Sequence, residues 1–208
     1  AEVELLKRIV DVLNEGKSAR VLTLTEDEEK LLRSYQLLSV KPIIYVANIA
    51  DDELTDDGKN NPWVKKVRDF AKDENAIVVT VSAKVEAELS ELDDEEKQEF
   101  MEMLDIEESG ISKLIVASYD LLGLLSFLTT GEDETRAWTI TKGTCAVEAA
   151  GKIHTDIQRG FIRAEIISYD DLMENGSMVA AKEKGKIRLE GKEYIMQDGD
   201  IVHFRFNV

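Results

Sequence analysis

The hydrophobic pattern of this chain is dominated by two short apolar runs that each end in polar residues. Residues 41–50 read Lys-Pro-Ile-Ile-Tyr-Val-Ala-Asn-Ile-Ala and precede Asp51, while the run 76–81 precedes Ser82-Ala83-Lys84. Between the runs, Asn61 followed by Pro62 is typical of a helix start. This segment also has an apolar face at helical spacing, formed by Val64, Val67, Phe70 and Ala71. The pattern predicts two buried parallel strands joined by a helix.

Polar groups at the carboxyl ends of the two strands are the first candidates for a binding site, because open α/β sheets bind ligands at that edge. The pattern Asn48-x-x-Asp51 after the first strand is typical of base recognition. Alone it is a weak signal, since both residues can satisfy backbone amides in a turn. Ser82-Ala83 after the second strand supplies the other loop expected around a purine, and the combination favours a purine site.

The phosphate-binding half of a nucleotide site has no counterpart in this sequence. No Gly-x-x-x-x-Gly-Lys-Ser/Thr motif occurs among the 208 residues. Phosphoryl transfer requires a phosphate cradle, a metal ion and a positioned water. The sequence therefore predicts base-recognition loops without catalytic residues, and we expect these 208 residues alone to be inactive in hydrolysis.

The first forty residues have the pattern of two helices. The first has an apolar stripe with residues spaced at intervals of three, four and three: Val3, Leu6, Val10 and Leu13. Leu5 and Ile9 widen this stripe, and Gly16 is expected to end the helix. This spacing suits a coiled coil or an ordinary amphipathic helix equally well. A capping box at Thr25–Glu28 predicts a second helix. The buried face expected for it is Leu31, Tyr35 and Leu38. The two helices could form an antiparallel hairpin, or residues 21–24 between them could hold a short strand.

The segment 86–125 predicts two further helices. One opens near Asp93-Asp94, where carboxylates favour the positive end of the helix dipole. Its inward side chains are expected to be Phe100, Met103 and Leu104. The other follows Gly110 as an apolar pattern that runs to Leu125 but is interrupted by Gly123. We take that interruption as a domain boundary.

Short strands and turns replace helices from Ser126 onward. Four strands are expected, at 136–141, 161–168, 186–190 and 201–208, with one short helix at 147–153. The last strand has one buried face, because Val202, Phe204, Phe206 and Val208 alternate with His203, Arg205 and Asn207. Four or five strands around one helix predict a small β-grasp domain. Trp138 lies within a strand pattern and is expected in its core.

The length and hydrophobic content of the chain are sufficient for two domains, and its low cysteine content is typical of a reducing compartment. The 23.4 kDa chain is 43% hydrophobic and has one cysteine, Cys145, which favours the cytoplasm. The chain has no signal-like start and no apolar run near the ~20 residues that span a bilayer, so no membrane association is expected. The net charge of −17 is uneven, with −14 in residues 1–125 and −3 in residues 126–208. The acidic first half argues against broad nonspecific binding of nucleic acid.

Several segments together resemble the YchF subfamily of Obg-like P-loop nucleotide hydrolases. They are Asn48-Ile49-Ala50-Asp51, Ser82-Ala83-Lys84-Val85-Glu86, residues 91–96, 136–140 and 149–156, and the ending from Asp198. The resemblance implies an α/β plus α+β chain. Residues 1–39 would be part of a helical coiled-coil insert, 40–124 the C-terminal part of the nucleotide-binding domain, and 125–208 a TGS domain of β-grasp type. The phosphate loop, switch segments and magnesium ligands would lie in a front part that this sequence lacks.

The resemblance also implies a role for each purine-loop residue. Asn48 would contact the purine N7 edge, and Ile49 replaces the lysine that stacks on guanine in ordinary GTPases, leaving a backbone amide and an apolar contact. Ser82 and Ala83 would present backbone amides to the six-position of the ring. The resemblance implies a preference for ATP. Asp51 weakens this preference, because it departs from the family's usual glutamate and could accept hydrogen bonds from guanine N1 and N2, so both ATP and GTP stay open as ligands.

The resemblance implies Mg²⁺ with ATP or GTP in the intact protein, and no cofactor or metal for this chain alone. The intact protein would hydrolyse the nucleotide and associate with the ribosome. The alternative is a non-catalytic RNA- or ribosome-binding module that acts through the TGS domain. An oligomeric state is not predicted.

Basic residues of the last 60 positions form the candidate RNA surface. One group lies near the short helix and consists of Lys152, Arg159 and Arg163, together with His154. The other lies in the later hairpin and consists of Lys182, Lys184, Lys186 and Arg188, together with Lys192. One basic face would suit RNA phosphates. A solvated face neutralised by Glu183, Glu190 and Glu193 is the alternative. His154 beside Asp156 is more simply a loop histidine than a catalytic group, since no nucleophile accompanies it.

Overall fold

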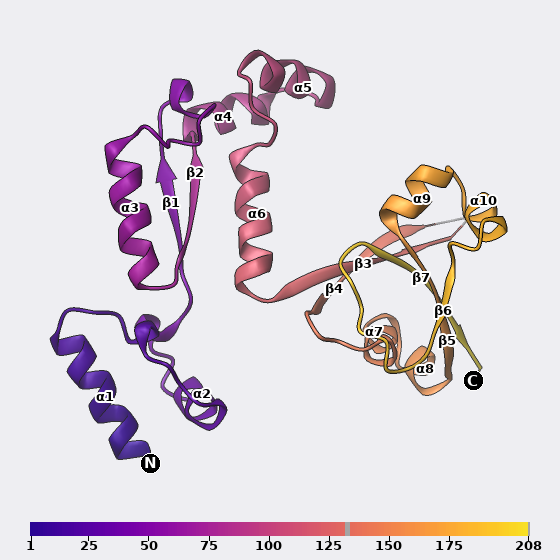
Figure 1. Ribbon diagram of the computed structural model, residues 1–208, viewed down its shortest axis with the longest axis horizontal. Coiled ribbons are helices and arrows are strands. Elements are labelled where there is room, and N and C mark those ends of the chain that lie inside the picture. The colour runs from indigo at the N-terminus through magenta and orange to yellow at the C-terminus, as the bar shows by residue number, and fades with distance from the viewer. Residues whose placement is uncertain (132–133, 208) are drawn as a thin grey trace. The chain divides into compact units, whose positions relative to one another are not determined.

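The computed structural model describes residues 1–131 and 134–207, which form two compact units, Ala1–Leu121 and Leu122–Val208 (Figure 1). The first unit contains short helices and a parallel strand pair. The second contains a five-stranded sheet with helices. Each unit is described by itself.

Two antiparallel helices open the first unit. The elements are α1 (Glu2–Asn14), the 3₁₀ turn η1 (Ala19–Val21), α2 (Glu26–Arg33) and the 3₁₀ turn η2 (Leu38–Val40). Arg8 in α1 contacts Glu28 at the start of α2, at 2.6 Å, and the Tyr35 hydroxyl beyond α2 donates to Glu2, at 2.6 Å. The helices therefore run in opposite directions. The predicted capping box at Thr25 is confirmed, and a 3₁₀ turn replaces the alternative of a strand.

The buried face of these helices differs from the predicted stripe. Their core consists of Leu5, Ile9, Ala19 and Leu32, whereas Val3 and Val10 are exposed. The i, i+4 pair Leu5 and Ile9 faces the 3₁₀ turn and α2, and Leu6 packs against the same cluster. The predicted stripe is therefore confirmed at these three residues and wrong at Val3 and Val10. The predicted face of α2 is confirmed at Leu31, which packs against this core, but is wrong at Tyr35 and Leu38. The helix ends at Arg33 and Gln36 has a positive φ of 51°, which leaves Tyr35 and Leu38 exposed.

The predicted strand, helix and strand are confirmed. They are β1 (Ile44–Asn48), α3 (Pro62–Asp73) and β2 (Ile77–Val81), with a 3₁₀ turn η3 (Asp51–Glu53) after β1. β1 and β2 are parallel, with register from Ile44↔Ile77 to Asn48↔Val81. The strands are less buried than expected because their sheet has two strands and β1 has a free edge. Val46 of β1, for example, is 47% exposed. In α3, Phe70 was predicted on the apolar face but is 56% exposed.

A buried carboxylate connects the opening helices to the strand pair. Glu74, just beyond α3, is 8% exposed and accepts hydrogen bonds from the Ser18 hydroxyl and the Tyr45 hydroxyl, both at 2.5 Å. These hydrogen bonds lower the pKa of Glu74, although its burial opposes them. The contact fixes the start of β1 relative to residues 1–40.

Three helices complete the first unit: α4 (Ala83–Glu91), α5 (Asp94–Met103) and α6 (Gly110–Leu121). The predicted start of α5 is confirmed, with Asp93 as its cap, but Met103 is exposed rather than inward. The sequence missed α4. Gly110 allows α6 to approach β2, since a Cβ there would overlap the Val81 side chain.

The second unit is a mixed sheet in the β-grasp order. Its strands are β3 (Leu124–Thr130), β4 (Thr135–Thr141), β5 (Phe161–Ser168), β6 (Arg188–Glu190) and β7 (Asp200–Phe206). The order is β4-β3-β7-β5-β6, with β3 and β7 parallel and the other pairs antiparallel. The predicted β-grasp architecture is therefore confirmed, but β3 was missed. Its leucines appeared to continue the apolar pattern of the preceding helix.

Among the described residues of this unit, four short helices accompany the sheet where one was predicted. They are α7 (Ala146–Ile153), α8 (Thr155–Arg159), α9 (Tyr169–Asn175) and α10 (Met178–Glu183). Phe127, Ala150, Ile166 and Phe204 lie in the main core, and Trp138 packs against it as expected. The predicted alternation of β7 is confirmed at Val202 to Arg205, whereas Phe206 is 47% exposed. Val208 lies outside the described residues.

Candidate purine-recognition site

The parallel register of β1 and β2 brings the two predicted purine loops together. Asn48 ends β1 opposite Val81, and Ser82 follows β2 directly. The backbone N–H of Ile49 donates to the Val81 carbonyl at 2.8 Å, which continues the pairing by one residue. Residues more than thirty positions apart in sequence thus share one edge of the sheet.

Asn48 and the start of α4 are in direct contact. The Asn48 Oδ1 accepts a hydrogen bond from the backbone N–H of Ala83 at 2.9 Å. Ala83 is the first residue of α4, and Ser82 is its N-cap in extended backbone conformation. Where the sequence predicted a loop, the structure has a helix start. The Asn48 Nδ2 makes no hydrogen bond within residues 1–131 and 134–207, so it is available as a donor.

Two of the predicted residues are largely inside the protein. The Ile49 side chain is 7% exposed and packs with Leu54, Val64 and Val85, while Ser82 is 2% exposed. In this conformation the Ile49 side chain faces the core, and its backbone N–H already donates to Val81. The exposed groups at this edge are Asn48, Ala83 and Asp51.

Asp51 forms an ion pair with Lys84. The Lys84 Nζ lies 2.6 Å from the Asp51 Oδ2, and the two side chains are 66% and 42% exposed respectively. The hydrogen bond from Lys84 lowers the pKa of Asp51 below its usual value and raises the pKa of Lys84 in return. Both groups are therefore charged at neutral pH.

The loop that carries Asp51 is fixed at its far end by Asp57. The Asp57 carboxylate accepts hydrogen bonds from Arg68 at 2.7 Å, Lys113 at 3.2 Å and the Thr80 hydroxyl, which come from α3, α6 and β2. Burial raises the pKa of Asp57, but the hydrogen bonds from Thr80 and Lys113 outweigh it and hold the pKa below its usual value. Asp57 also has a positive φ of 57°. One carboxylate thus ties the loop to three elements.

The candidate RNA-binding residues fall into two groups rather than one face. Lys152 and Arg159 lie on α7 and α8, near Arg163 at the start of β5, whereas Lys182 and Lys184 belong to α10 and its end. Figure 1 shows α7 with α8 and α9 with α10 at opposite ends of the sheet.

Ion pairs further separate the basic residues. Arg159, Lys186 and Arg188 pair with Asp156, Asp171 and Asp200. Of the candidate basic residues, five form no ion pair in the part of the chain that the structure describes: Lys152, Arg163, Lys182, Lys184 and Lys192. Acidic partners thus neutralise some basic positions, although Glu183 and Glu193 are not among them.

His154 has a local structural role. Its Nδ1 accepts a hydrogen bond from the backbone N–H of Asp156 at 3.2 Å, which caps α8. Among the described residues, no group of three or more His, Cys, Asp or Glu side chains could hold a metal ion. No helix of the same residues is long and apolar enough to cross a bilayer.

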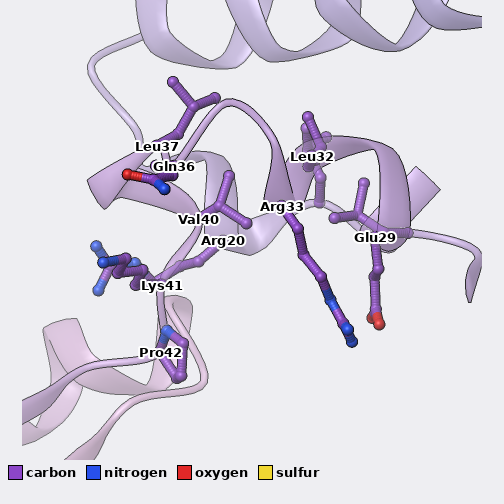
Figure 2. Close-up of a pocket in the computed structure, with 11 residues that line it drawn as sticks. Arg20, Glu29, Leu32, Arg33, Gln36, Leu37, Val40, Lys41 and Pro42 are labelled. Atoms are coloured by element: carbon purple, nitrogen blue, oxygen red, sulfur yellow. The ribbon is translucent and has the colours of Figure 1, made fainter.

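A cavity of about 480 Å³ lies among the opening helical elements, away from the purine loops. Figure 2 shows its lining, which comes from residues 20–42 and includes Leu32, Val40 and Pro42 together with Arg20 and Arg33. No purine-loop residue contributes to it.

Comparisons with known proteins identify the family of this chain. The model of a family described as YchF-GTPase_C, protein of unknown function (DUF933), matches residues 124–207. The ribosome-binding ATPase YchF of Bacillus subtilis is 53% identical over all of this chain, and that of Haemophilus ducreyi is 47% identical. The chain belongs to the YchF family. It spans 56% of the length of both relatives.

Solved structures of related proteins show the same fold. The Schizosaccharomyces pombe YchF GTPase matches 98% of this chain and 54% of its own chain, with a TM-score of 0.81 and 32% identity. A GTP binding protein from Pyrococcus horikoshii matches with a TM-score of 0.55 and 21% identity, which supports the fold alone. The mixed α/β class predicted for this YchF chain is confirmed.

Sequence reasoning missed the roles of Lys84 and Asp57. Lys84 stands within the Ser-Ala-Lys motif, but no local pattern connects it to a carboxylate 33 positions earlier. Asp57-Gly58 indicates a turn, which is a weak signal for a residue that joins three elements.

The Asp57 cluster gives a pH-dependent prediction. Asp57→Asn is expected to lower the free energy of unfolding at neutral pH by about 1 kcal/mol, a value reduced for the partial exposure of the carboxylate. Because the folded pKa is lowered, the carboxylate contributes above the unfolded pKa and its contribution is lost as pH falls through the folded pKa. Urea unfolding at neutral pH and below about pH 3.9 should show the gap from wild type closing in acid.

Asp52→Asn is the matched control, because Asp52 is an exposed carboxylate of the same loop. It should leave stability nearly unchanged at both pH values. A gap for Asp57→Asn that is absent, or that stays constant with pH, would contradict the anchoring role.

Proposed function

We propose that this chain carries the purine-recognition edge of a nucleotide site and a TGS-type β-grasp domain, within a protein that hydrolyses ATP or GTP and associates with the ribosome. The observation that supports the nucleotide site is the contact between Asn48 and Ala83 beside Asp51, at the carboxyl ends of two parallel strands. The relatives named ribosome-binding ATPase support the wider assignment.

The chemistry of the edge suits a purine. The Asn48 Nδ2 is a donor for N7, which is an acceptor in both adenine and guanine. Ala83 provides a backbone N–H near the six-position, and Asp51 provides a carboxylate. Ser82 and Ile49 are both buried, so they would support the edge from inside the protein rather than contact the base with their side chains.

Phosphate and Mg²⁺ binding are proposed for the intact protein and not for these residues. These 208 residues contain no Gly-x-x-x-x-Gly-Lys-Ser/Thr motif. We therefore assign no catalytic residue in this chain. The Mg²⁺ ion would neutralise phosphate charge in the intact site.

The opening helices are proposed to be part of a coiled-coil insert. Val3, Val10 and Leu13 keep the spacing of a coiled-coil stripe and are 67%, 52% and 43% exposed. We also propose a cytoplasmic location, because the relatives are named as ribosome-binding proteins.

Removing the Asn48 amide tests the nucleotide site. Asn48→Ala is expected to weaken adenosine binding by the 208-residue chain about tenfold, because the N7 donor is lost and the Ala83 N–H loses its fixed acceptor. Titration followed by NMR measures the affinity. Asn60→Ala is the control, since Asn60 is an exposed asparagine whose amide bonds Asp56.

Equal adenosine affinities for Asn48→Ala and wild type would contradict this site. They would favour an RNA-binding protein unrelated to nucleotide hydrolysis.

A second function, RNA or ribosome binding through the β-grasp domain, is supported by the basic residues without ion pairs. Lys182 and Lys184 lie close in sequence at the end of α10, and neither forms an ion pair within the described ranges. Free ammonium groups release counterions when they bind RNA phosphates.

Replacing Lys182 and Lys184 with Gln is expected to weaken co-sedimentation with purified ribosomes and to reduce the salt slope by roughly 0.7 to 0.9 per lost phosphate contact. The control replaces Lys59 and Lys65, two exposed lysines of the first unit, with Gln. Unchanged affinity and slope for the Lys182 and Lys184 variant would contradict the assignment of this group.

A further inference from the structure

The cavity within residues 20–42 is lined by basic residues in a part of the chain that is otherwise acidic. Its volume of about 480 Å³ lies within the roughly 300–1,000 Å³ of small-molecule sites. Three lining residues are basic, Arg20, Arg33 and Lys41, and one is acidic, Glu29. Residues 1–125 together have a net charge of −14. A local excess of positive charge therefore surrounds this one cavity.

The three basic residues of the cavity have no carboxylate partner. Within residues 1–131 and 134–207, none of them forms an ion pair, whereas other basic residues of the same helices do. Arg8 pairs with Glu28, and Lys30 pairs with Asp27. The positive charge at the cavity is thus not neutralised by neighbouring side chains of the described chain.

Arg20 contains a buried donor without an acceptor. Its Nε donates to the Ser39 carbonyl at 3.4 Å, but its Nη1 is buried and has no hydrogen-bond partner among the described residues. Arg20 lies close enough to Glu74 to lower the pKa of that carboxyl, yet Glu74 accepts its hydrogen bonds from Ser18 and Tyr45 instead. A buried charged donor that lacks an acceptor is costly, so an anion that reached Nη1 would bind favourably.

The rest of the cavity wall is mainly apolar. It consists of Leu22, Leu24, Leu32, Leu37, Val40 and Pro42. All of these except Pro42 also belong to the core of the opening helices or pack against it, so the wall is held in place by the fold. Figure 2 shows Arg33 and Glu29 extending in the same direction from α2, with Lys41 and Pro42 on another side of the lining. An apolar wall with charged groups at its edges suits a ligand that has both characters.

We propose that this cavity binds a small amphipathic anion, which is a carboxylate or phosphate group on an apolar body. The anionic group would accept hydrogen bonds from Arg20, with Arg33 and Lys41 adding positive charge, and the body would contact the leucines. Guanidinium groups suit carboxylate and phosphate equally, because their donors match two oxygens at once. The site is independent of the proposed purine edge, since Pro42 precedes β1 whereas the purine edge follows it.

NMR titration of the 208-residue chain with octanoate tests this site, with the Leu22, Gln36 and Leu37 amides as reporters. Octanoate has both parts of the ligand, acetate has the anionic group alone, and octanol has the apolar body alone. Octanoate should bind saturably and about tenfold more tightly than octanol, which is the size of one charge-assisted hydrogen bond. Acetate should cause no saturable shift. Octyl phosphate should also bind, and its affinity relative to octanoate identifies the preferred anionic group.

Two variants test the basic residues. Arg20→Met should weaken octanoate binding about tenfold, because the buried donor is lost. Arg33→Gln should weaken it about threefold, since an exposed charge contributes less. Neither should change the affinity for octanol. If Arg20→Met does not fold, Arg33→Gln still carries the test, because Arg33 is exposed.

Lys30→Gln is the matched control, because Lys30 is an exposed basic residue of α2 that does not line the cavity. It should leave the affinity for octanoate unchanged. Equal affinities for octanoate and octanol would overturn the proposal, as would a saturable acetate shift of the same strength. Octanoate binding that Arg33→Gln and a folded Arg20→Met leave unchanged, or that shifts no reporter amide, would overturn it too.

Discussion

The parallel pairing of β1 with β2 is the constraint on which the candidate site depends. Its register puts Asn48 opposite Val81, and this places the Asn48 side chain against the start of α4. A shift of one residue would turn Asn48 toward the other face of the sheet. Two further carboxylates secure the arrangement. Glu74 fixes the start of β1, and Asp57 fixes the loop beyond its end.

Most polar groups of the site already have partners in the chain. Ala83 and Asp51 are both engaged, so a purine must displace these two contacts, whereas the Asn48 Nδ2 has no partner among the described residues. Such a site binds weakly by its base alone, because each new hydrogen bond is offset by one that is lost. Affinity in a nucleotide site of this kind would come mainly from phosphate groups, and the base edge would supply selectivity.

The sequence was most informative where local chemistry determines structure. The caps at Thr25, Asn61 and Asp93 were predicted from their residue types and confirmed. The two strands of the purine edge were predicted from their apolar runs. The sequence was least informative where tertiary contacts determine which residues are buried and which element forms. Leu5 rather than Val3 is buried because of what packs on α1, and the leucines of β3 have no periodicity that distinguishes a strand from a helix end. In the site, Asn48 and Asp51 were predicted, whereas the Lys84 and Asp57 contacts arise from elements distant in sequence.

The most direct measurement of the central claim is the location of adenosine on the chain, mapped by NMR chemical-shift changes of backbone and side-chain amides. The account predicts the largest changes at the Asn48 side-chain amide and the Ala83 backbone N–H, because their mutual hydrogen bond must change when the base binds. Changes confined to the residues that line the cavity within positions 20–42, with Asn48 and Ala83 unaffected, would contradict it.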